Sequence, residues 1–324
     1  MTWLDPDPFL RGVAWRDATG RAVRADPADL TRLPWATAER AGLPIGVRLE
    51  FTAEGASAIE IRYRASVPAP TEALSALAHT FALWAAGRCV RETTVTPARE
   101  AVVRLQLPST GGRFTVHPPE PMAPVVLALR GVGGALAPVP AAPRWLVHGD
   151  SITEGWWSTR PAHAWPSVAG RALGLDTVNL GYAGGARGEL ATAEQLAALP
   201  ADVLTLAFGT NCWSGAPCSA RLLYARTRNF LTALRRGHPR TPLLLLSPLL
   251  RPAAERTPNA VGSTLTELRT AMEEAAGDAN DSRLQVLPGR DLVTPADLAD
   301  GLHPNDRGHE KIAAAVAEVL RPRI

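Results

Sequence analysis

Lysine is almost absent from this chain of 324 residues, and its absence bears on possible partners. Lys311 is the only lysine, the arginines are scattered along the chain, and the formal net charge is only +3. Nucleic-acid binding needs basic residues concentrated on one surface. The cluster RRGHPR, 235–240, is typical of a helix end, where cations suit the negative end of the helix dipole. We therefore expect no nucleic-acid partner.

Cysteine is also scarce, which excludes two further classes. Cys89, Cys212 and Cys218 form neither a disulfide framework nor the paired CxxC spacing of a zinc site. The glycines of GYAGGARG, 181–188, lack the spacing and the following acidic residue of a dinucleotide-binding fingerprint. With no cluster of metal-ligating residues in the sequence, we expect neither a metal nor a cofactor.

Long apolar runs are missing too. The stretch PLLLLSPLL, 242–250, is far too short to span a bilayer. The first residues, MTWLDPDPFLRG, have no basic start followed by an apolar core, so they do not resemble a secretory signal. These absences predict a cytoplasmic protein without a membrane partner.

The two halves of the chain show different periodicities. Between about 45 and 132, apolar and polar residues alternate, as in VRLEF at 47–51, IEIRYR at 59–64, VVRLQL at 102–107 and FTVH at 114–117. A two-residue repeat indicates strands with one face in water. Many such strands without intervening helices predict an antiparallel sandwich or jelly roll. The earlier stretch ADLTRLPWATAERAGL, 28–43, is compatible with a short helix in a connecting loop.

After a Pro- and Ala-rich stretch at 136–144, interpreted as a linker, the pattern changes. Apolar runs at 145–148, 177–180, 203–208, 243–246 and 284–287 alternate with helix-like segments. One of these segments has a possible capping box from Thr264 to Glu267. Strands that are apolar on both faces and alternate with helices predict a doubly wound parallel sheet. We expect an accessory domain at 1–138 and a catalytic domain at 139–324.

Chemistry-bearing residues follow four of these predicted strands. WLVHGDSITEGWW, 145–157, places Ser151 just after a strand, and DGLHPND, 300–306, supplies Asp300 and His303 after the last one. A serine hydroxyl becomes a nucleophile when a base takes its proton, and a carboxylate orients that base. NLGYAGG at 179–185 and Asn211 of FGTN offer N–H donors to an oxyanion. Taken singly, each is equally an ordinary turn, cap or loop residue.

Together, GDSIT, NLGYAG, GTN and DGLHP resemble the four sequence blocks of the SGNH, or GDSL, hydrolases, in that family's order. The resemblance covers residues 144–324. It implies that Ser151 is the nucleophile, His303 the base and then the acid, and Asp300 the residue that orients His303. It also implies an oxyanion hole formed by the backbone N–H groups of Ser151 and Gly184 and the amide of Asn211. Cys212 departs from the pattern, since many members have aspartate there.

The alternating half resembles the jelly-roll domain that precedes the SGNH domain in the second family of carbohydrate esterases. That resemblance implies a domain that shapes the acceptor side of the site or binds a sugar, although it equally fits a domain that only packs. Trp156 and Trp157 either line an acyl or sugar pocket or pack internally. Arg187 either favours an anionic substrate or lies on the surface.

Three functions remain open from the sequence. The first is a serine ester hydrolase acting through an acyl-enzyme on small acyl esters, which the resemblance suggests are esters of sugars or glycosylated metabolites. The second is an acyltransferase that passes the acyl group to a sugar or natural-product hydroxyl. The third is a carbohydrate-binding protein with an inactive site, against which the intact set of five site residues argues.

Overall fold

The structure is a computed structural model that describes residues 2–65, 79–96 and 98–324. The chain divides into two compact units. One contains the residues up to Pro27 together with Gly42–Ala142, and the other contains Ala28–Ala41 together with Pro143–Ile324. The first is an antiparallel β-sandwich, and the second is a parallel α/β unit, as the two periodicities predicted.

The sandwich consists of two antiparallel sheets. One has the strand order β1-β4-β9-β6-β7, with β11 also paired to β4, and the other has the order β10-β5-β8; β2 and β3 form a separate pair. The strands are β1 Leu10–Arg11, β2 Trp15–Arg16, β3 Ala22–Val23, β4 Arg48–Glu54, β5 Ala58–Arg64, β6 Thr80–Ala85, β7 Arg88–Thr94, β8 Ala101–Gln106, β9 Gly111–His117, β10 Val125–Val132 and β11 Ala135–Pro138. Alternate residues of β4 are buried, which confirms the predicted alternation.

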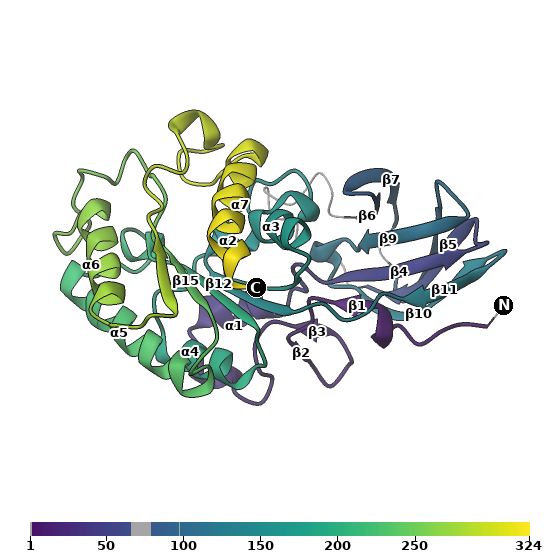
Figure 1. Cartoon of the computed structure of the whole chain (residues 1–324), viewed down its shortest axis with the longest axis horizontal. Coiled ribbons are helices and arrows are strands. Elements are labelled where there is room, and N and C mark those ends of the chain that lie inside the picture. Colours follow the sequence, from purple (N-terminus) through teal and green to yellow (C-terminus); the bar gives the residue numbers. More distant parts are fainter. Residues whose placement is uncertain (1, 66–78, 97) are drawn as a thin grey trace. The chain divides into compact units, whose positions relative to one another are not determined.

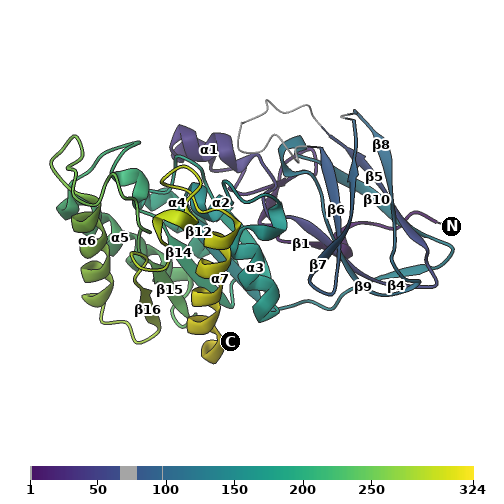
Figure 2. The same cartoon turned by 90° about the horizontal axis from the view of Figure 1, so that it is seen from above.

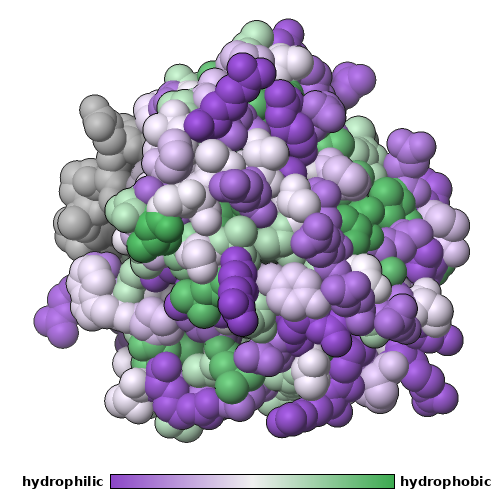
Figure 3. Space-filling view, turned by 90° about the vertical axis from the view of Figure 1, so that its left-hand side faces the viewer, coloured by the Kyte–Doolittle hydropathy of each residue, from purple (hydrophilic) through white to green (hydrophobic). Residues whose placement is uncertain are grey.

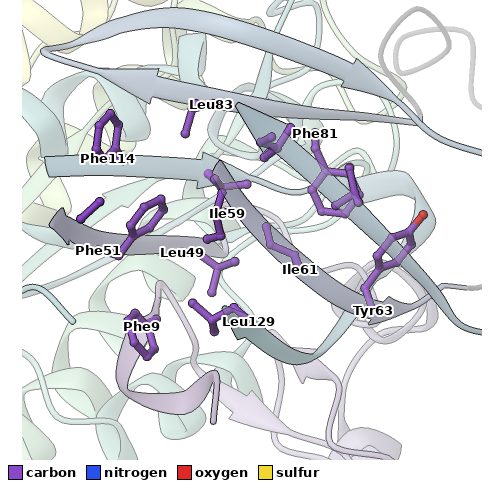
Figure 4. Packing of buried hydrophobic residues seen from close by; sticks show 14 of the residues in the cluster. Phe9, Leu49, Phe51, Ile59, Ile61, Tyr63, Phe81, Leu83, Phe114 and Leu129 are labelled. Carbon is purple, nitrogen blue, oxygen red and sulfur yellow. The ribbon is translucent and has the colours of Figure 1, made fainter. Parts of the chain in front are cut away.

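The core of the sandwich is apolar and lies between its two sheets. Phe51 and Phe114 come from β4 and β9 of one sheet, while Ile59 and Ile61 come from β5 of the other. Figure 4 shows these side chains pointing toward one another between the sheets. Phe51 and Phe114 pack with their ring centroids 5.6 Å apart. The side chains that alternate along each strand therefore form one shared core.

The predicted linker at 136–144 is shorter than expected. Its first three residues belong to β11, which pairs antiparallel with β4 from Ala135 opposite Glu54 to Pro138 opposite Phe51. Proline lacks a backbone N–H and is tolerated at such a strand end, so its presence was a poor sign of a linker. Only residues 139–143 lie between the end of β11 and the start of the next strand at Arg144.

The second unit is built on a parallel sheet of order β13-β12-β14-β15-β16. Its strands are β12 Arg144–Gly149, β13 Asp176–Gly181, β14 Val203–Ala207, β15 Leu243–Leu246 and β16 Leu284–Leu287. All four leucines of β15 are buried, as expected for a strand covered on both faces. Each predicted apolar run is a strand, which confirms the doubly wound interpretation.

Helices cover both faces of this sheet. They are α1 Trp35–Ala41, α2 Ser151–Glu154, α3 Trp165–Leu173, α4 Leu190–Ala198, α5 Ala220–Gly237, α6 Leu265–Gly277 and α7 Asp306–Leu320. In the views of Figure 1 and Figure 2, α3 and α7 lie together on one face, and α4 and α5 lie on the other. The capping box predicted at the start of α6 is present, with Thr264 and Glu267 bonded to each other's backbone.

The segment 28–43 contains a short helix, α1, as its sequence allowed. Residues 28–41 belong to the second unit, although they precede most of the sandwich in the sequence. Asp29 accepts a hydrogen bond from Gln195 of α4 at 3.1 Å, and Arg32 pairs with Glu194. Sequence periodicity could not assign this segment, because its contacts are with residues more than a hundred positions later.

On the face of the second unit in Figure 3, hydrophilic residues separate small apolar patches. Within the described ranges, every helix is too short or too polar to cross a bilayer.

Candidate active site

Ser151 is the first residue of α2, and only Asp150 separates it from the end of β12. The Asp150 carboxylate caps this helix by accepting a hydrogen bond from the Ile152 backbone N–H at 3.0 Å. Gly149 is needed because α2 folds closely over the strand end. A Cβ at this position would lie 2.1 Å from Thr153 Oγ1 and 2.3 Å from the Ala207 carbonyl oxygen. The Gly-Asp-Ser sequence therefore makes a tight strand-to-helix turn that presents the serine.

The structure brings Ser151, His303 and Asp300 into one hydrogen-bonded chain. Ser151 Oγ lies 2.8 Å from His303 Nε2, and His303 Nδ1 lies 2.7 Å from Asp300 Oδ2. Ser151 follows β12, whereas the other two lie on the loop between β16 and α7. Parallel strands end at the same edge of a sheet, so residues 152 positions apart in the sequence meet there.

Asp300 is fixed by more than the imidazole. Its other oxygen, Oδ1, accepts hydrogen bonds from the backbone N–H groups of Leu302 at 3.0 Å and His303 at 2.8 Å. Partial burial favours the protonated acid, but the hydrogen bonds from His303 and Leu302 outweigh it, so the pKa of Asp300 lies below its ordinary value. An ionised carboxylate accepts a hydrogen bond from Nδ1–H, and this tautomer leaves the lone pair of Nε2 facing Ser151.

The predicted oxyanion donors lie on neighbouring loops. Gly184 follows β13 and has a φ of +71°, a left-handed conformation that glycine adopts without strain. Asn211 follows β14, and its Nδ2 donates to the Gly185 carbonyl oxygen at 2.8 Å. An amide nitrogen carries two hydrogens, so this bond uses one of them and ties the Asn211 side chain to the Gly184 loop.

Arg187 lies beside the same loop. Its guanidinium donates to the Gly184 carbonyl oxygen, and its Nη1 lies 3.9 Å from a carboxylate oxygen of Glu189. The charge of Arg187 thus already faces a carboxylate of its own chain, and its hydrogen bond braces the turn at Gly184. Recognition of an anionic substrate by Arg187 stays a prediction.

The two tryptophans after the serine have different environments. Trp156 stacks on the imidazole of His303, with ring centroids 5.4 Å apart and an angle of 29° between the planes. Trp157 is 39% exposed and has a φ of +65°, which is unusual for a residue with a large side chain. Trp156 therefore packs on the proposed base. A pocket-lining role for either ring stays a prediction.

Cys212 is the alternative nucleophile and His148 the alternative base that the sequence offers near the site, and the environments of both side chains disfavour these roles. A hydrogen bond with Cys218, together with burial, raises the pKa of the Cys212 thiol well above its ordinary value, which disfavours a thiolate nucleophile. His148 is buried, its Nδ1 lies 3.1 Å from the Leu180 carbonyl oxygen, and its ring stacks on Phe230. Burial lowers the pKa of His148 to about 4, so it stays neutral within an aromatic cluster.

The sequence interpretation missed two charged residues beside the site. The Glu154 carboxylate is buried against the Arg40 guanidinium, and it also accepts a hydrogen bond from Trp156 Nε1 at 3.1 Å. Glu154 stands within the GDSITEGWW stretch itself, but a single glutamate is normally a solvated residue. Arg40 comes from α1, for which no pairing was predicted. The signal for Glu154 in the sequence is a carboxylate placed between the Gly-Asp-Ser turn and two tryptophans.

A doubly wound parallel sheet with a hydrogen-bonded serine, histidine and aspartate at its carboxyl edge is the arrangement of an SGNH-type hydrolase domain, here preceded by a β-sandwich. Residues 147–311, more than half of the chain, match the GDSL-like lipase/acylhydrolase family, and the chain belongs to that family. The resemblance noted from the four sequence blocks is thus confirmed.

Solved structures share the two-part architecture. A salicylyl-acyltransferase from a tetracycline biosynthetic pathway matches with a TM-score of 0.85 at 24% identity, over 99% of both chains. A candidate GDSL-like lipase from Bacteroides ovatus matches with a TM-score of 0.81 at 20% identity, over 99% of this chain and 97% of that one. A family two carbohydrate esterase from Cellvibrio japonicus gives 0.68 at 16% identity, over 99% and 97%. Among curated protein sequences, none matches the chain significantly.

Proposed function

We propose that this protein is a serine ester hydrolase that forms an acyl-enzyme on Ser151. The observation that carries the proposal is the hydrogen-bonded chain from Ser151 Oγ through His303 to Asp300, with separations of 2.8 and 2.7 Å. These are the contacts through which a serine hydroxyl passes its proton to an imidazole held by a carboxylate. Membership of a hydrolase family supports the same reaction class.

In the first step, Ser151 Oγ attacks the carbonyl carbon of the ester while His303 Nε2 takes the hydroxyl proton. The negative charge that develops on the carbonyl oxygen is stabilised by the backbone N–H groups of Ser151 and Gly184 and by the Asn211 amide. When the tetrahedral intermediate collapses, the bond to the leaving oxygen breaks. His303 returns the proton to that oxygen, and the alcohol departs.

In the second step, His303 takes a proton from water as its oxygen attacks the acyl-enzyme. A second tetrahedral intermediate forms in the same oxyanion hole and collapses to release the acid. The proton on His303 returns to Ser151 Oγ, so the enzyme is regenerated. Asp300 remains ionised throughout and stabilises the imidazolium in both steps.

The substrate class follows by analogy with structural neighbours. A neighbour of this two-part architecture is a carbohydrate esterase, and we propose small acyl esters of sugars or glycosylated metabolites as substrates. We also propose that the two compact units correspond to the accessory and catalytic domains expected at 1–138 and 139–324. In this assignment, the segment 28–41 belongs with the catalytic domain.

A second candidate function is acyl transfer to an alcohol. The observation in its favour is the match to a salicylyl-acyltransferase over 99% of both chains. The same residues serve both reactions, because a sugar or natural-product hydroxyl replaces water as the attacker of the acyl-enzyme. The two functions differ in which nucleophile reaches the acyl carbonyl.

Release of p-nitrophenol from p-nitrophenyl acetate tests both candidates. The wild type, Ser151→Ala and a matched control, Ser158→Ala, are each assayed alone and with added methanol or glucose. The control removes a neighbouring hydroxyl, which donates to the Gly155 carbonyl oxygen at 2.7 Å. We expect steady turnover in water for the wild type and the control, and loss of turnover in Ser151→Ala.

Other outcomes separate the alternatives. A single burst of nitrophenol that becomes turnover only after an acceptor is added would identify a transferase. Turnover retained by Ser151→Ala would remove this serine from the nucleophile role. If the wild type shows neither burst nor turnover with acetate or longer acyl esters, the third function, a binding protein with an inactive site, would replace the proposal.

A further inference from the structure

Glu154 forms a hub of hydrogen bonds that the proposed mechanism does not use. It is the last residue of α2, and its side chain is only 2% exposed. Its carboxylate accepts from three other residues. These are the Arg40 guanidinium, with Nε 3.3 Å away, Trp156 Nε1 at 3.1 Å and the backbone N–H of Ala183 at 3.0 Å. The contacts with Trp156 and Ala183 lead to two different parts of the site, and the contact with Arg40 supplies the opposite charge.

Arg40 supplies the counter-charge that allows Glu154 to be buried. A carboxylate taken out of water costs several kcal/mol unless it is paired and hydrogen-bonded. Arg40 comes from α1, 114 positions earlier, and its guanidinium also lies 5.9 Å from the centre of the Trp156 ring. Buried ion pairs often add little to stability compared with apolar residues, so the contribution that we consider for this pair is the geometry that it imposes.

The first arm of the hub reaches the base. Trp156 donates its indole N–H to Glu154 and stacks on the imidazole of His303. At its other end, the Trp156 carbonyl oxygen lies 3.1 Å from His309 Nε2. Glu154 therefore holds the ring and His309 the backbone of Trp156, and the stacking restricts rotation of the imidazole whose Nε2 faces Ser151.

The second arm reaches the oxyanion loop. Glu154 Oε2 accepts from the N–H of Ala183, and the next residue is Gly184, whose N–H is the proposed oxyanion donor. The end of β13 lies directly against the end of α2, since a Cβ on Gly181 would be 2.3 Å from the Glu154 nitrogen. The same carboxylate thus fixes where the turn at Gly184 begins.

We propose that Glu154, whose charge is neutralised by Arg40, is a positioning residue. It holds the base and the oxyanion loop in the correct positions relative to each other. It acts through Trp156 on His303 and through Ala183 on Gly184, and it touches no reacting atom itself. The inference rests on the proposed function, because both arms end at residues assigned roles there. A small misplacement of catalytic groups of this kind costs up to about 100-fold in rate.

Glu154→Gln is the informative substitution because glutamine has the same shape but only one acceptor oxygen. One of its two positions becomes an NH₂ donor, so it loses either the Ala183 bond or the Trp156 bond. It also leaves the Arg40 charge without its partner. The double variant Glu154→Gln/Arg40→Met removes both charges and keeps the test valid if the single variant folds poorly.

The assay is steady-state hydrolysis of p-nitrophenyl acetate, with the folded fraction followed by circular dichroism. We expect kcat to fall by about 10–100-fold in both variants while KM changes little, because geometry at the reacting atoms affects the transition state more than substrate binding. Arg40→Lys, which keeps the charge, should retain more activity than Arg40→Met. The matched control is Asp281→Asn, which breaks a 2.6 Å ion pair to Arg235 at the opposite edge of the sheet and should keep the wild-type kcat.

Coupling between the two arms gives a second readout. Glu154→Gln should lower kcat by a smaller factor in the Trp156→Leu background than in the wild type, because the contact through Trp156 is already lost there. Fully additive losses, a wild-type kcat in the folded fraction of Glu154→Gln, or an equal fall in Asp281→Asn would each overturn the inference. Ser151→Ala separates this failure from failure of the proposed function. If that variant is inactive and Glu154→Gln is fully active, only the role of Glu154 is wrong.

Discussion

Replacing Asp300 by asparagine tests how the base is oriented, and the structure predicts which way the new side chain faces. Asp300 Oδ1 accepts two backbone N–H groups, from Leu302 and His303, whereas Oδ2 faces His303 Nδ1 at 2.7 Å. An asparagine keeps its carbonyl oxygen toward the two backbone donors, so its NH₂ group faces Nδ1. Nδ1 must then accept, and the ring proton moves to Nε2, which can no longer take the Ser151 proton.

The size of the effect depends on how far water can compete. In a serine protease with a buried aspartate, the same substitution lowers kcat by about 10⁴-fold. The Asp300 side chain is 35% exposed, so water can solvate the imidazole in part. We therefore expect a loss of about 10²–10³-fold in kcat/KM, or about 3–4 kcal/mol of transition-state stabilisation.

The assay is p-nitrophenyl acetate hydrolysis by Asp300→Asn, Asp300→Ala and His303→Ala. Asp300→Asn should be less damaging than His303→Ala but more damaging than Asp300→Ala, because alanine imposes no tautomer on the imidazole. An asparagine variant more active than the alanine variant would refute the tautomer argument. A silent Asp300→Asn would mean that Ser151 and His303 act as a dyad.

Two further predictions concern the oxyanion hole and the pH dependence of stability. Asn211→Ala should lower turnover of p-nitrophenyl acetate by about 10²–10³-fold if its amide stabilises the oxyanion, and an unchanged rate would remove Asn211 from the hole. Burial lowers the pKa of His309 from 6.5 to about 4. As the pH falls, the histidine is therefore protonated first in the unfolded chain, which favours unfolding. The stability that depends on neutral His309 is fully present above pH 6.5 and is lost as the pH falls toward 4. The difference in unfolding free energy between the wild type and His309→Gln should therefore shrink by about 3 kcal/mol over that range in urea titrations; a constant difference would contradict it. Comparing the two proteins cancels the opposite effect of Asp150, whose pKa is raised to about 7 by burial.

Much of the fold could be predicted because its signals are local. The alternation in β4 and β5 and the apolar runs of β12 and β15 depend only on which faces each strand buries. The order of the strands within each sheet depends on pairing between distant segments, and no local pattern encodes it. The strand β11 was misinterpreted for this reason, since its pairing partner β4 lies about 80 residues earlier.

The candidate site divides in the same way. Ser151, His303 and Asp300 could be singled out because each follows a strand, and parallel strands end at one edge. The contacts around them could not. The stacking of Trp156 on His303 and the pairing of Glu154 with Arg40 depend on side-chain packing between α1, α2 and two loops.

The most direct test of the central claim is to trap the acyl-enzyme. Wild-type protein is mixed with p-nitrophenyl acetate, quenched in acid within the first turnover, digested and analysed by mass spectrometry, beside Ser151→Ala. The account predicts one acetyl group on the peptide that contains Ser151 and none in the variant. An acetyl group on another residue, or ester turnover by Ser151→Ala, would contradict it.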